Sequence, residues 1–475
     1  MNEAIATSAA TTAAAPVPAG TLGFRALFAA AIGVIVAQIG MVSVMQGLGI
    51  AGWGFVVALC IAYALALANV LAYAELSLML PSAGSLSSFA QAALGHFPAI
   101  LLVFAGYITP AMFGLPAELI LVDQIVTQAL PLPLPPFAWA VALVLVFAWL
   151  NVLGTDIFAR VQTALGFIVL IFLLVTGALA LGGVGTPASA DGHDVALASL
   201  AEDTMVLGIV ALAFWIFMGV EFVTPLVNEA RDARRDMPRA MVLGLTAIFG
   251  AQLLFALGGA AVLPREQLAG SATPHLDAVV AIFGPHAKVW FAALALVASA
   301  SLFNTVLAAV PRMLWGMAMN GQVFPVFKYT HPRHGTPVAA IAFVAALPLV
   351  GLLWSGGRVD AILPLMIAAS VAWLLAYTMA QVSLLVLRWR HPEWPRPFRV
   401  PLFPLLPLAA IAGMTVVVFN SSPAPEMTAQ IASYTGIVLA VFAVVGALWV
   451  KLAMKRGLFE PERPELAALP GAAKE

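Results

Sequence analysis

Two glutamates lie inside apolar stretches of the sequence, where charged groups are rare. Glu221 ends the apolar run 205–220, and Glu118 lies within the run 98–124. A charged group in a membrane segment costs at least ~2.5 kcal/mol on insertion scales, so it normally faces a partner, a water-filled cavity or a proton path. Glu221 is therefore a candidate proton carrier, with a structural carboxylate held by backbone N–H groups as the alternative. Glu118 is a candidate for recognising an amine from an outer vestibule, unless it is simply solvated there.

Other polar groups restrict the chemistry further. Gln38 lies in the first apolar stretch, where its amide could hydrogen-bond a ligand or join two helices. Cys60 is the only cysteine, so neither an intrachain disulfide nor a cysteine metal cluster can form. The seven histidines fall in predicted loops or at helix ends, which leaves metal or haem chemistry without ligands at depth. A membrane enzyme is therefore disfavoured, and the sequence has no repeated filter loop or charged ring typical of a channel.

The elements that position these residues follow from composition. Of the 475 residues, 63% are apolar and 9% are charged, whereas soluble domains are about a quarter charged. Continuous apolar runs of about 20 residues predict membrane-spanning helices, because lipid offers open backbone groups no partners. We predict an all-α integral membrane protein with twelve transmembrane helices, at 26–48, 52–79, 98–124, 137–154, 160–182, 205–228, 238–263, 288–316, 337–354, 361–388, 401–420 and 430–452.

The distribution of Lys and Arg predicts the orientation. If the N-terminus is cytoplasmic, the outer segments carry only Arg265, Lys288 and Arg358 of the 21 basic residues. Cytoplasmic segments are rich in Lys and Arg, so we predict a multi-pass protein of the cell membrane with both termini cytoplasmic. We expect residues 1–24 to be a disordered cytoplasmic tail, 25–455 the membrane domain and 456–475 a second cytoplasmic tail.

Helix-breaking residues recur five spans apart. The first span contains three glycines, with Gly49 directly after it, and the sixth contains Gly219 with Pro225 after it. Corresponding interruptions are typical of two inverted five-helix repeats, here about 26–182 and 205–388, with two extra helices at 401–452. Glycines that only allow close helix packing are the alternative.

Four stretches in the expected order resemble the amino acid-polyamine-organocation (APC) superfamily, within its amino acid permease family. They are Tyr73–Leu76 with Pro81–Gly84, Phe214–Glu221 with Asn228–Asp232 and Met237–Ala240, Ala300–Asn304 with Pro311–Met313, Asn320–Pro325 and Gly335–Pro337, and Arg396–Pro401. The resemblance implies a LeuT-like fold, with 5+5 helices and broken helices 1 and 6, and a small solute held between the breaks. A half-helix start favours a carboxylate, and a half-helix end favours an ammonium or another cation.

The resemblance also implies a substrate site. Trp215 corresponds to an aromatic gate over the substrate, and an indole can stack against a cationic head. Phe214 and Phe217 could line the pocket or pack against neighbouring helices. The implied substrate-binding set is Gln38, Ile39, Gly40, Met41, Ser43, Phe214, Trp215, Phe217 and Gly219.

Two departures from the family pattern concern substrate and coupling. The usual Gly-(Ser/Ala)-Gly signature is absent from the first span, which weakens the expectation of an α-amino-acid carboxylate there, since glycine lets backbone approach a ligand. Nine residues after Arg160 the family often has a lysine that imitates sodium, but here the residue is Val169. Coupling could run through a proton on Glu221, through exchange, or through sodium near Ala300, Ser301 and Asn304.

The sequence thus predicts a secondary active transporter, not an enzyme, for an amino acid, with a polyamine or another organic amine as the alternative. We expect no cofactor, a proton as coupling ion with sodium still open, and no nucleic-acid partner. Glu75 is expected to be structural and to pair with a basic residue of an inner loop. Arg160 and Arg312 are inner-gate candidates, for which snorkelling to the interface is the favoured interpretation.

Overall fold

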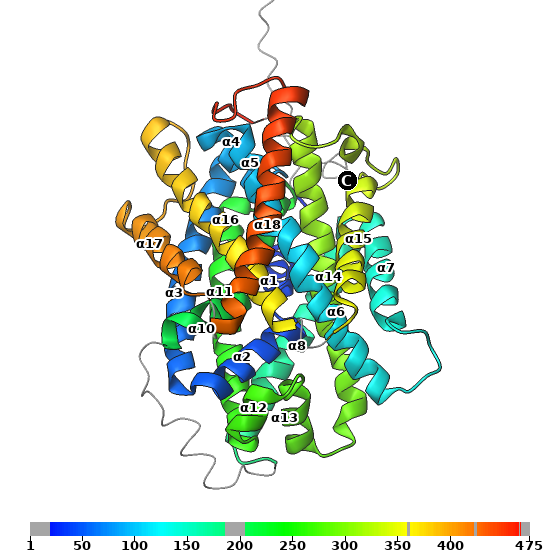
Figure 1. Ribbon diagram of the computed structural model, residues 1–475. Helices are drawn as coiled ribbons and strands as arrows, with labels where there is room; N and C mark the ends of the chain where they lie inside the picture. Colours follow the sequence, from blue (N-terminus) through cyan, green and yellow to red (C-terminus); the bar gives the residue numbers. More distant parts are fainter. Residues whose placement is uncertain (1–19, 186–204, 359–361, 422–424, 465, 467–475) are drawn as a thin grey trace, which may run out of the picture.

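The computed structural model describes residues 20–185, 205–358, 362–421, 425–464 and 466, which form a bundle of packed helices (Figure 1). The long elements are α3 (Trp53–Met79), α6 (Thr109–Ala129), α8 (Thr155–Leu181), α11 (Ala233–Val262), α14 (Ala287–Met319), α15 (Val338–Ser355), α16 (Ile362–Arg390) and α18 (Pro425–Leu448). The shorter ones are α1 (Phe24–Gly33), α2 (Gln38–Ala51), α4 (Leu86–Leu94), α5 (His96–Val103), α7 (Ala138–Val152), α10 (Met205–Phe214), α12 (Arg265–Gly270), α13 (Pro274–Phe283) and α17 (Leu405–Phe419).

Nine helical segments among the described residues are long and apolar enough to cross a membrane, and α1 with α2 forms a tenth that is broken. Each predicted span corresponds to a helix or a broken helix at the expected place in the chain. The helices α7 and α17 are apolar but have 15 residues each, fewer than the about 20 that a span perpendicular to the bilayer needs. The all-helical membrane fold is confirmed, while the count of twelve crossings stays a prediction.

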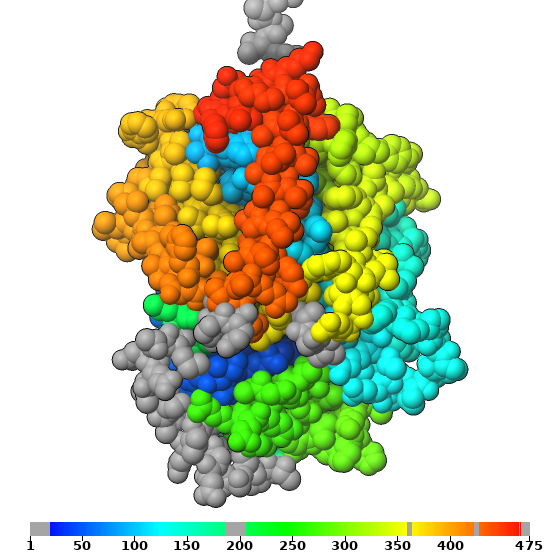
Figure 2. All heavy atoms as spheres, viewed as in Figure 1, coloured from blue at the N-terminus to red at the C-terminus, as the bar shows by residue number. Residues whose placement is uncertain are grey.

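Burial separates a central group of helices from a peripheral one. In an 18-residue apolar stretch of α14, 83% of the residues are buried. In the corresponding stretch of Met427–Ala453, which includes most of α18, 11% are buried. Figure 2 shows α18 running along the surface of the bundle. A helix that is apolar all round yet exposed needs lipid as its solvent, so α18 has the surface of a lipid-facing helix.

The first predicted break lies between α1 and α2, whose axes differ by 55°. The α-helical pattern stops at Gly33 and restarts at Gln38, because Val34–Ala37 form a turn in which Ala37 is extended, with ψ 157°. Ala37 supplies no side-chain cap to α2. The break leaves the last carbonyls of α1 and the first N–H groups of α2 without intrahelical partners inside the bundle.

The second predicted break follows α10. Residues Trp215–Phe217 form a single 3₁₀ turn, Met218 is extended, and Gly219 has φ +117°. That backbone conformation is rare for residues with a Cβ, which explains glycine at this position. The chain continues as a 3₁₀ helix, η3 (Val220–Glu229). The helical backbone is therefore interrupted at both expected places, while the inverted repeat stays a prediction.

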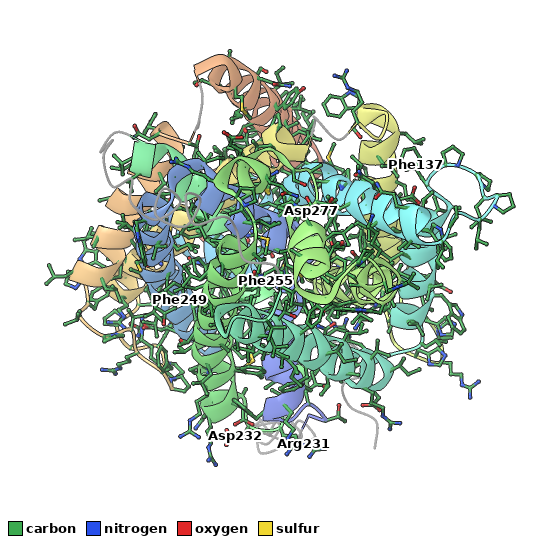
Figure 3. All side chains as sticks on the ribbon, turned by 90° about the horizontal axis from the view of Figure 1, so that it is seen from below. Phe137, Arg231, Asp232, Phe249, Phe255 and Asp277 are labelled. Carbon is green, nitrogen blue, oxygen red and sulfur yellow. The ribbon has the colours of Figure 1, made fainter. Side chains whose placement is uncertain are left out.

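The two ends of the bundle are covered differently. The helices α12 and α13 lie at the end where α2 finishes, and in the view from that end Asp277 of α13 lies near the middle of the bundle (Figure 3). At the other end, Leu22 forms a parallel bridge with Ala230, immediately after η3. Residues 456–464 of the predicted second tail also pack there, with the Phe97 and Phe459 rings 5.6 Å apart.

Candidate functional site

The N-terminus of α2 is capped by a carboxylate from another helix. The backbone N–H of Gln38 donates to Oε1 of Glu118 at 3.1 Å, and that of Ile39 donates to Oε2 at 2.8 Å. Glu118 belongs to α6, and its side chain is fully buried. Two convergent N–H groups at a half-helix start form a site for an anion, and here a glutamate of the same chain occupies it.

A hydrogen-bonded chain holds this carboxylate in place. The Gln38 side-chain amide donates to Oγ of Ser299 at 2.8 Å, and the Ser299 hydroxyl donates to Oε1 of Glu118 at 2.5 Å. Nε2 of His275 lies 3.4 Å from the side-chain oxygen of Gln38. Burial of this histidine, in α13 outside the spans, lowers its pKa to about 3, so the ring is neutral and places no positive charge near Glu118.

The carbonyl end of α1 is satisfied by polar side chains of two scaffold helices. The Ser301 hydroxyl donates to the carbonyl of Gly33 at 3.1 Å. The amide of Gln162, in α8, donates to the carbonyl of Ala29 at 3.1 Å and to Oγ of Ser301 at 2.8 Å. Asn304 donates to the side-chain oxygen of Gln162 at 3.1 Å. Ser301 and Asn304, two of the three residues considered for sodium, are therefore bonded to each other through Gln162.

Glu221 lies at the second break and is 1% exposed. Its Oε2 accepts from the Tyr377 hydroxyl at 2.5 Å and from the backbone N–H of Gly219 at 3.2 Å, and its Oε1 accepts from the Trp373 indole at 3.0 Å. Trp373 and Tyr377 are four residues apart in α16 and therefore share one face of that helix. Within the described residues neither Glu221 nor Glu118 takes part in an ion pair.

Aromatic rings surround the second break. Trp215 and Trp373 meet edge to face with ring centroids 6.2 Å apart, and Trp373 contacts Phe222 in the same way at 5.7 Å. The Tyr107 ring lies 5.2 Å from that of Phe222. Such a lining of rings can hold an organic cation or an apolar group beside the buried carboxylate.

One face of α6 reaches both breaks. A Cβ built on Gly114 would lie 2.5 Å from the Trp215 indole, so the missing side chain lets this ring lie across the helix. Glu118 is four residues further along, about one turn, and therefore faces the same way. The Trp215 ring and the α2 start thus lie about one helical turn apart along α6, as expected for two sides of one site.

The other predicted site residues lie in different surroundings. Phe214 packs against Tyr377, with ring centroids 6.2 Å apart. Phe217 instead packs against Phe249 at 6.0 Å and against Tyr63, on the α11 and α3 side of η2 (Trp215–Phe217). The Ser43 hydroxyl donates to the carbonyl of Leu212 at 2.8 Å and so joins α2 to α10.

Two further predicted residues, Gly40 and Met41, are buried in the first turn of α2. A Cβ on Gly40 would lie 3.3 Å from the Gln252 amide and 3.8 Å from Ile216 of the second break. Gly40 therefore lies between the two breaks.

The end of the bundle that contains the Leu22–Ala230 bridge also contains a buried ion pair. Nε of Arg312 donates to Oε1 of Glu229, at the end of η3, at 2.9 Å, and its side chain is 4% exposed. A second bond joins the guanidinium to the hydroxyl of Thr155 at 2.9 Å. The expectation that Arg312 snorkels is therefore wrong, because η3 brings a buried carboxylate to it. Arg160 is exposed, as expected.

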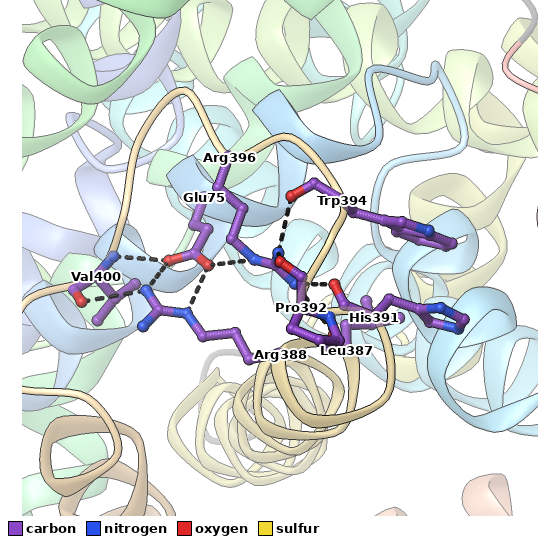
Figure 4. A network of polar contacts seen from close by, with 8 residues as sticks. All are labelled: Glu75, Leu387, Arg388, His391, Pro392, Trp394, Arg396 and Val400. Carbon is purple, nitrogen blue, oxygen red and sulfur yellow. Dashed lines mark hydrogen bonds and ion pairs between the residues drawn. The ribbon is translucent and has the colours of Figure 1, made fainter.

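Glu75 is a structural acid, as predicted. Its carboxylate accepts from Arg388 and from the backbone N–H of Val400 at 2.6 Å, and Arg396 of the inner loop lies 3.4 Å from it (Figure 4). The Glu75 side chain is fully buried. This network fixes the loop between α16 and α17 to the C-terminal end of α3.

The sequence analysis missed Ser299, Trp373, Tyr377 and the bonding role of Gln162. Trp373 and Tyr377 carried a readable signal, since two polar-tipped rings four residues apart mark one face of an apolar helix. Ser299 is adjacent to the stretch 300–304 that carried the family resemblance, but no pattern in the sequence pairs it with Glu118.

Both the sequence and the fold are similar to those of known proteins. A family model described as amino acid permease matches residues 22–447. The branched-chain amino acid permease BcaP of Bacillus subtilis is 24% identical over 400 residues, which are 78% of this chain and 81% of that protein. The serine/threonine exchanger SteT of the same organism is 25% identical, over 78% of this chain and 84% of that protein.

Other relatives match over a smaller part of their length. The mouse cationic amino acid transporter 4 is 26% identical over 255 residues, so the match spans 53% of this chain but only 36% of that protein. Among solved structures, the manganese transporter of Eremococcus coleocola, bound to an aromatic bis-isothiourea compound, superposes with a TM-score of 0.57. It is 14% identical, with 90% of this chain and 94% of that chain covered, and supports the fold alone.

Proposed function

Because this chain belongs to the amino acid permease family, we propose that it moves a small nitrogenous solute, an amino acid or an organic amine, by alternating access. The relatives are permeases and exchangers, so the chain is a transporter and not an enzyme. The observation that carries the proposal is the pair of helix breaks, at Val34–Ala37 and Trp215–Gly219, which meet at one face of α6. Half-helix ends inside a membrane bundle are where transporters bind polar solutes.

The proposed architecture has twelve crossings in two inverted repeats, about 26–182 and 205–388, followed by α17 and α18. Breaks in the first and sixth spans, five apart, support the repeat. The proposed location is the cell membrane with both tails on the cytoplasmic side. The excess of Lys and Arg at that side supports this orientation.

Within the site, the half-helix start at Gln38–Met41, with Ser43, and the Phe214–Gly219 segment enclose the solute, and Trp215 closes it from the outer side. The Trp215 contact with Gly114 and Trp373 supports the gating role, because it places the ring between α6 and α16. Phe217 and Ser43 contribute to the shape of the site through packing, since their contacts lie with other helices.

Glu221 is the proposed proton carrier. It is buried and outside the ion pairs of the described residues, and it bonds to a break residue, so its protonation would alter the Gly219 contact directly. Sodium is the less favoured coupling ion, because Ser301 and Asn304, which would serve it, are already hydrogen-bonded to Gln162.

The test is uptake into proteoliposomes of a radiolabelled panel of amino acids, monoamines and polyamines, with an imposed pH or sodium gradient. The variant Glu221→Gln should lose proton-driven accumulation while it retains exchange of internal for external solute. Glu266→Gln, at an exposed glutamate of α12, is the matched control and should accumulate like wild type. Undiminished proton-driven accumulation by Glu221→Gln would exclude the coupling role.

A further inference from the structure

Resting on the proposed transport function, we infer that Glu118 fills the carboxylate-binding position of the site and that the substrate is an organic amine lacking a free carboxylate. The starting observation is occupancy of the α2 start. Both N–H groups that converge there, from Gln38 and Ile39, donate to the two oxygens of Glu118. These contacts imitate the way a bound carboxylate would be held.

The contact between Glu118 and the start of α2 is supported by several independent features. Ala37 provides no cap for α2, and Glu118 comes from α6, 80 positions away in the chain from Gln38. Ser299 adds a third donor, at 2.5 Å, and Ser299 itself accepts from the Gln38 side chain. Three groups, the backbone N–H groups of Gln38 and Ile39 and the Ser299 hydroxyl, therefore donate to the carboxylate. A substrate carboxylate would have to displace Glu118 and would then face a like charge.

The charge of the surroundings points to the complementary class of substrate. Glu118 and Glu221 are both buried and lie outside the ion pairs of the described residues, and His275, at the outer side of Gln38, is neutral. A buried charge is normally paired, so a site with two acidic groups requires positive charge from what it binds. A proton on Glu221 and an ammonium beside Glu118 supply it. The rings of Trp215, Trp373 and Tyr107 suit the alkyl or aryl part of the amine.

The missing glycine signature agrees with this assignment. The family resemblance implied small residues at the start of α2, which would let a ligand carboxylate approach the backbone, but Gln38 and Ile39 stand there. With Glu118 in position, the N–H groups need no access for a ligand, and side chains there are tolerated. The departure in α2 and the glutamate in α6 thus have one explanation.

The experiment uses matched ligands that differ only in the carboxylate. The measured quantity is inhibition of the uptake, into proteoliposomes, of a radiolabelled compound that the panel above shows to be transported. The competitors form three sets: arginine and agmatine; lysine and cadaverine; and phenylalanine, its methyl ester and phenethylamine. In the set that binds best, we expect the amine or ester to compete at a concentration at least tenfold lower than the free amino acid. In Glu118→Ala, which leaves the two N–H groups free, that ratio should fall at least tenfold. Asp123→Ala, a half-buried acid five residues further along α6, is the matched control and should retain the wild-type ratio.

The outcomes separate the two levels of the proposal. Equal or better competition by the free amino acids in wild type would overturn the assignment of Glu118 and leave the transport function intact. An unchanged ratio in Glu118→Ala protein that still transports would overturn it as well. Uptake of none of these compounds would contradict the transport function and, with it, the inference. If Glu118→Ala does not fold, the wild-type ratios alone decide.

Discussion

The buried pair of Arg312 and Glu229 should hold the inner side of the transporter closed. The perturbation is Arg312→Ala. Both side chains are almost fully buried, at 4% and 7% exposed, and Oε2 of Glu229 has no hydrogen-bond partner in the described residues. Removing one partner of a buried pair costs about 3–5 kcal/mol, because the other charge stays buried and unpaired.

This free-energy cost destabilises mainly the closed state of the transporter, in which Glu229 is buried. When the inner side opens, water reaches Glu229 and relieves the unpaired charge. The lower figure, about 3 kcal/mol, shifts the equilibrium towards the open state by roughly a hundredfold at about 1.4 kcal/mol per tenfold. Arg160→Ala, which removes an exposed arginine of α8, should shift the equilibrium little.

The assay labels one introduced cysteine, which is possible because the chain has a single native cysteine to remove. Cys60 is replaced by serine and Thr224, which is fully buried in η3, is replaced by cysteine. We expect the rate of maleimide labelling at this position to rise by up to about a hundredfold in Arg312→Ala. Glu229→Gln in the same protein should cancel much of the rise, because no charge then remains unpaired. Equal labelling rates in Arg312→Ala and Arg160→Ala would refute the gate.

Two further predictions concern stability. Glu75→Gln should reduce stability by about 3 kcal/mol, since Arg388 and Arg396 lose a buried anion; thermal unfolding in detergent measures this, and a melting temperature like that of Glu393→Gln, at an exposed site, would contradict it. Burial lowers the pKa of His275 to about 3, so the folded state excludes a proton that the unfolded chain takes up near pH 6.5. Stability should therefore be full above pH 6.5 and fall by about 1.4 kcal/mol per pH unit as the pH drops towards 3. Melting temperatures at pH 7 and pH 5 test this, and a His275→Gln protein with the same pH dependence as wild type would argue against it.

The membrane fold and its breaks were readable from the sequence because they depend on local properties. Apolar length predicts a span, and Gly219 with its positive φ marks a place where a helix must stop. The break before Gln38 was located through the family resemblance, although the family's glycines are missing there. The predicted boundaries agree with the helices within a few residues.

The contacts that define the site could not be read in the same way. The bond from Ile39 to Glu118 depends on which helices are neighbours, and no periodicity in either segment carries that information. Arg312 was expected to reach water because arginines near helix ends usually do, but its neighbour in space is Glu229. Glu118 was expected in a vestibule because its position along α6 indicates how deep it lies in the membrane. That position does not indicate which neighbouring helix its side chain faces.

The pairing of Leu22 with the chain after η3 has a mechanical consequence. Leu22 donates to the carbonyl of Glu229 and accepts from the N–H of Arg231, both at 2.9 Å. These two bonds join the segment before α1 to the segment after η3, so one half of each broken helix is linked to the other at this end of the bundle. A displacement of either segment is transmitted to the other through these two hydrogen bonds, without any contact to the substrate. The two interrupted helices would then move together as one rigid unit. The ion pair of Arg312 with Glu229 would hold this unit in place until the pair breaks.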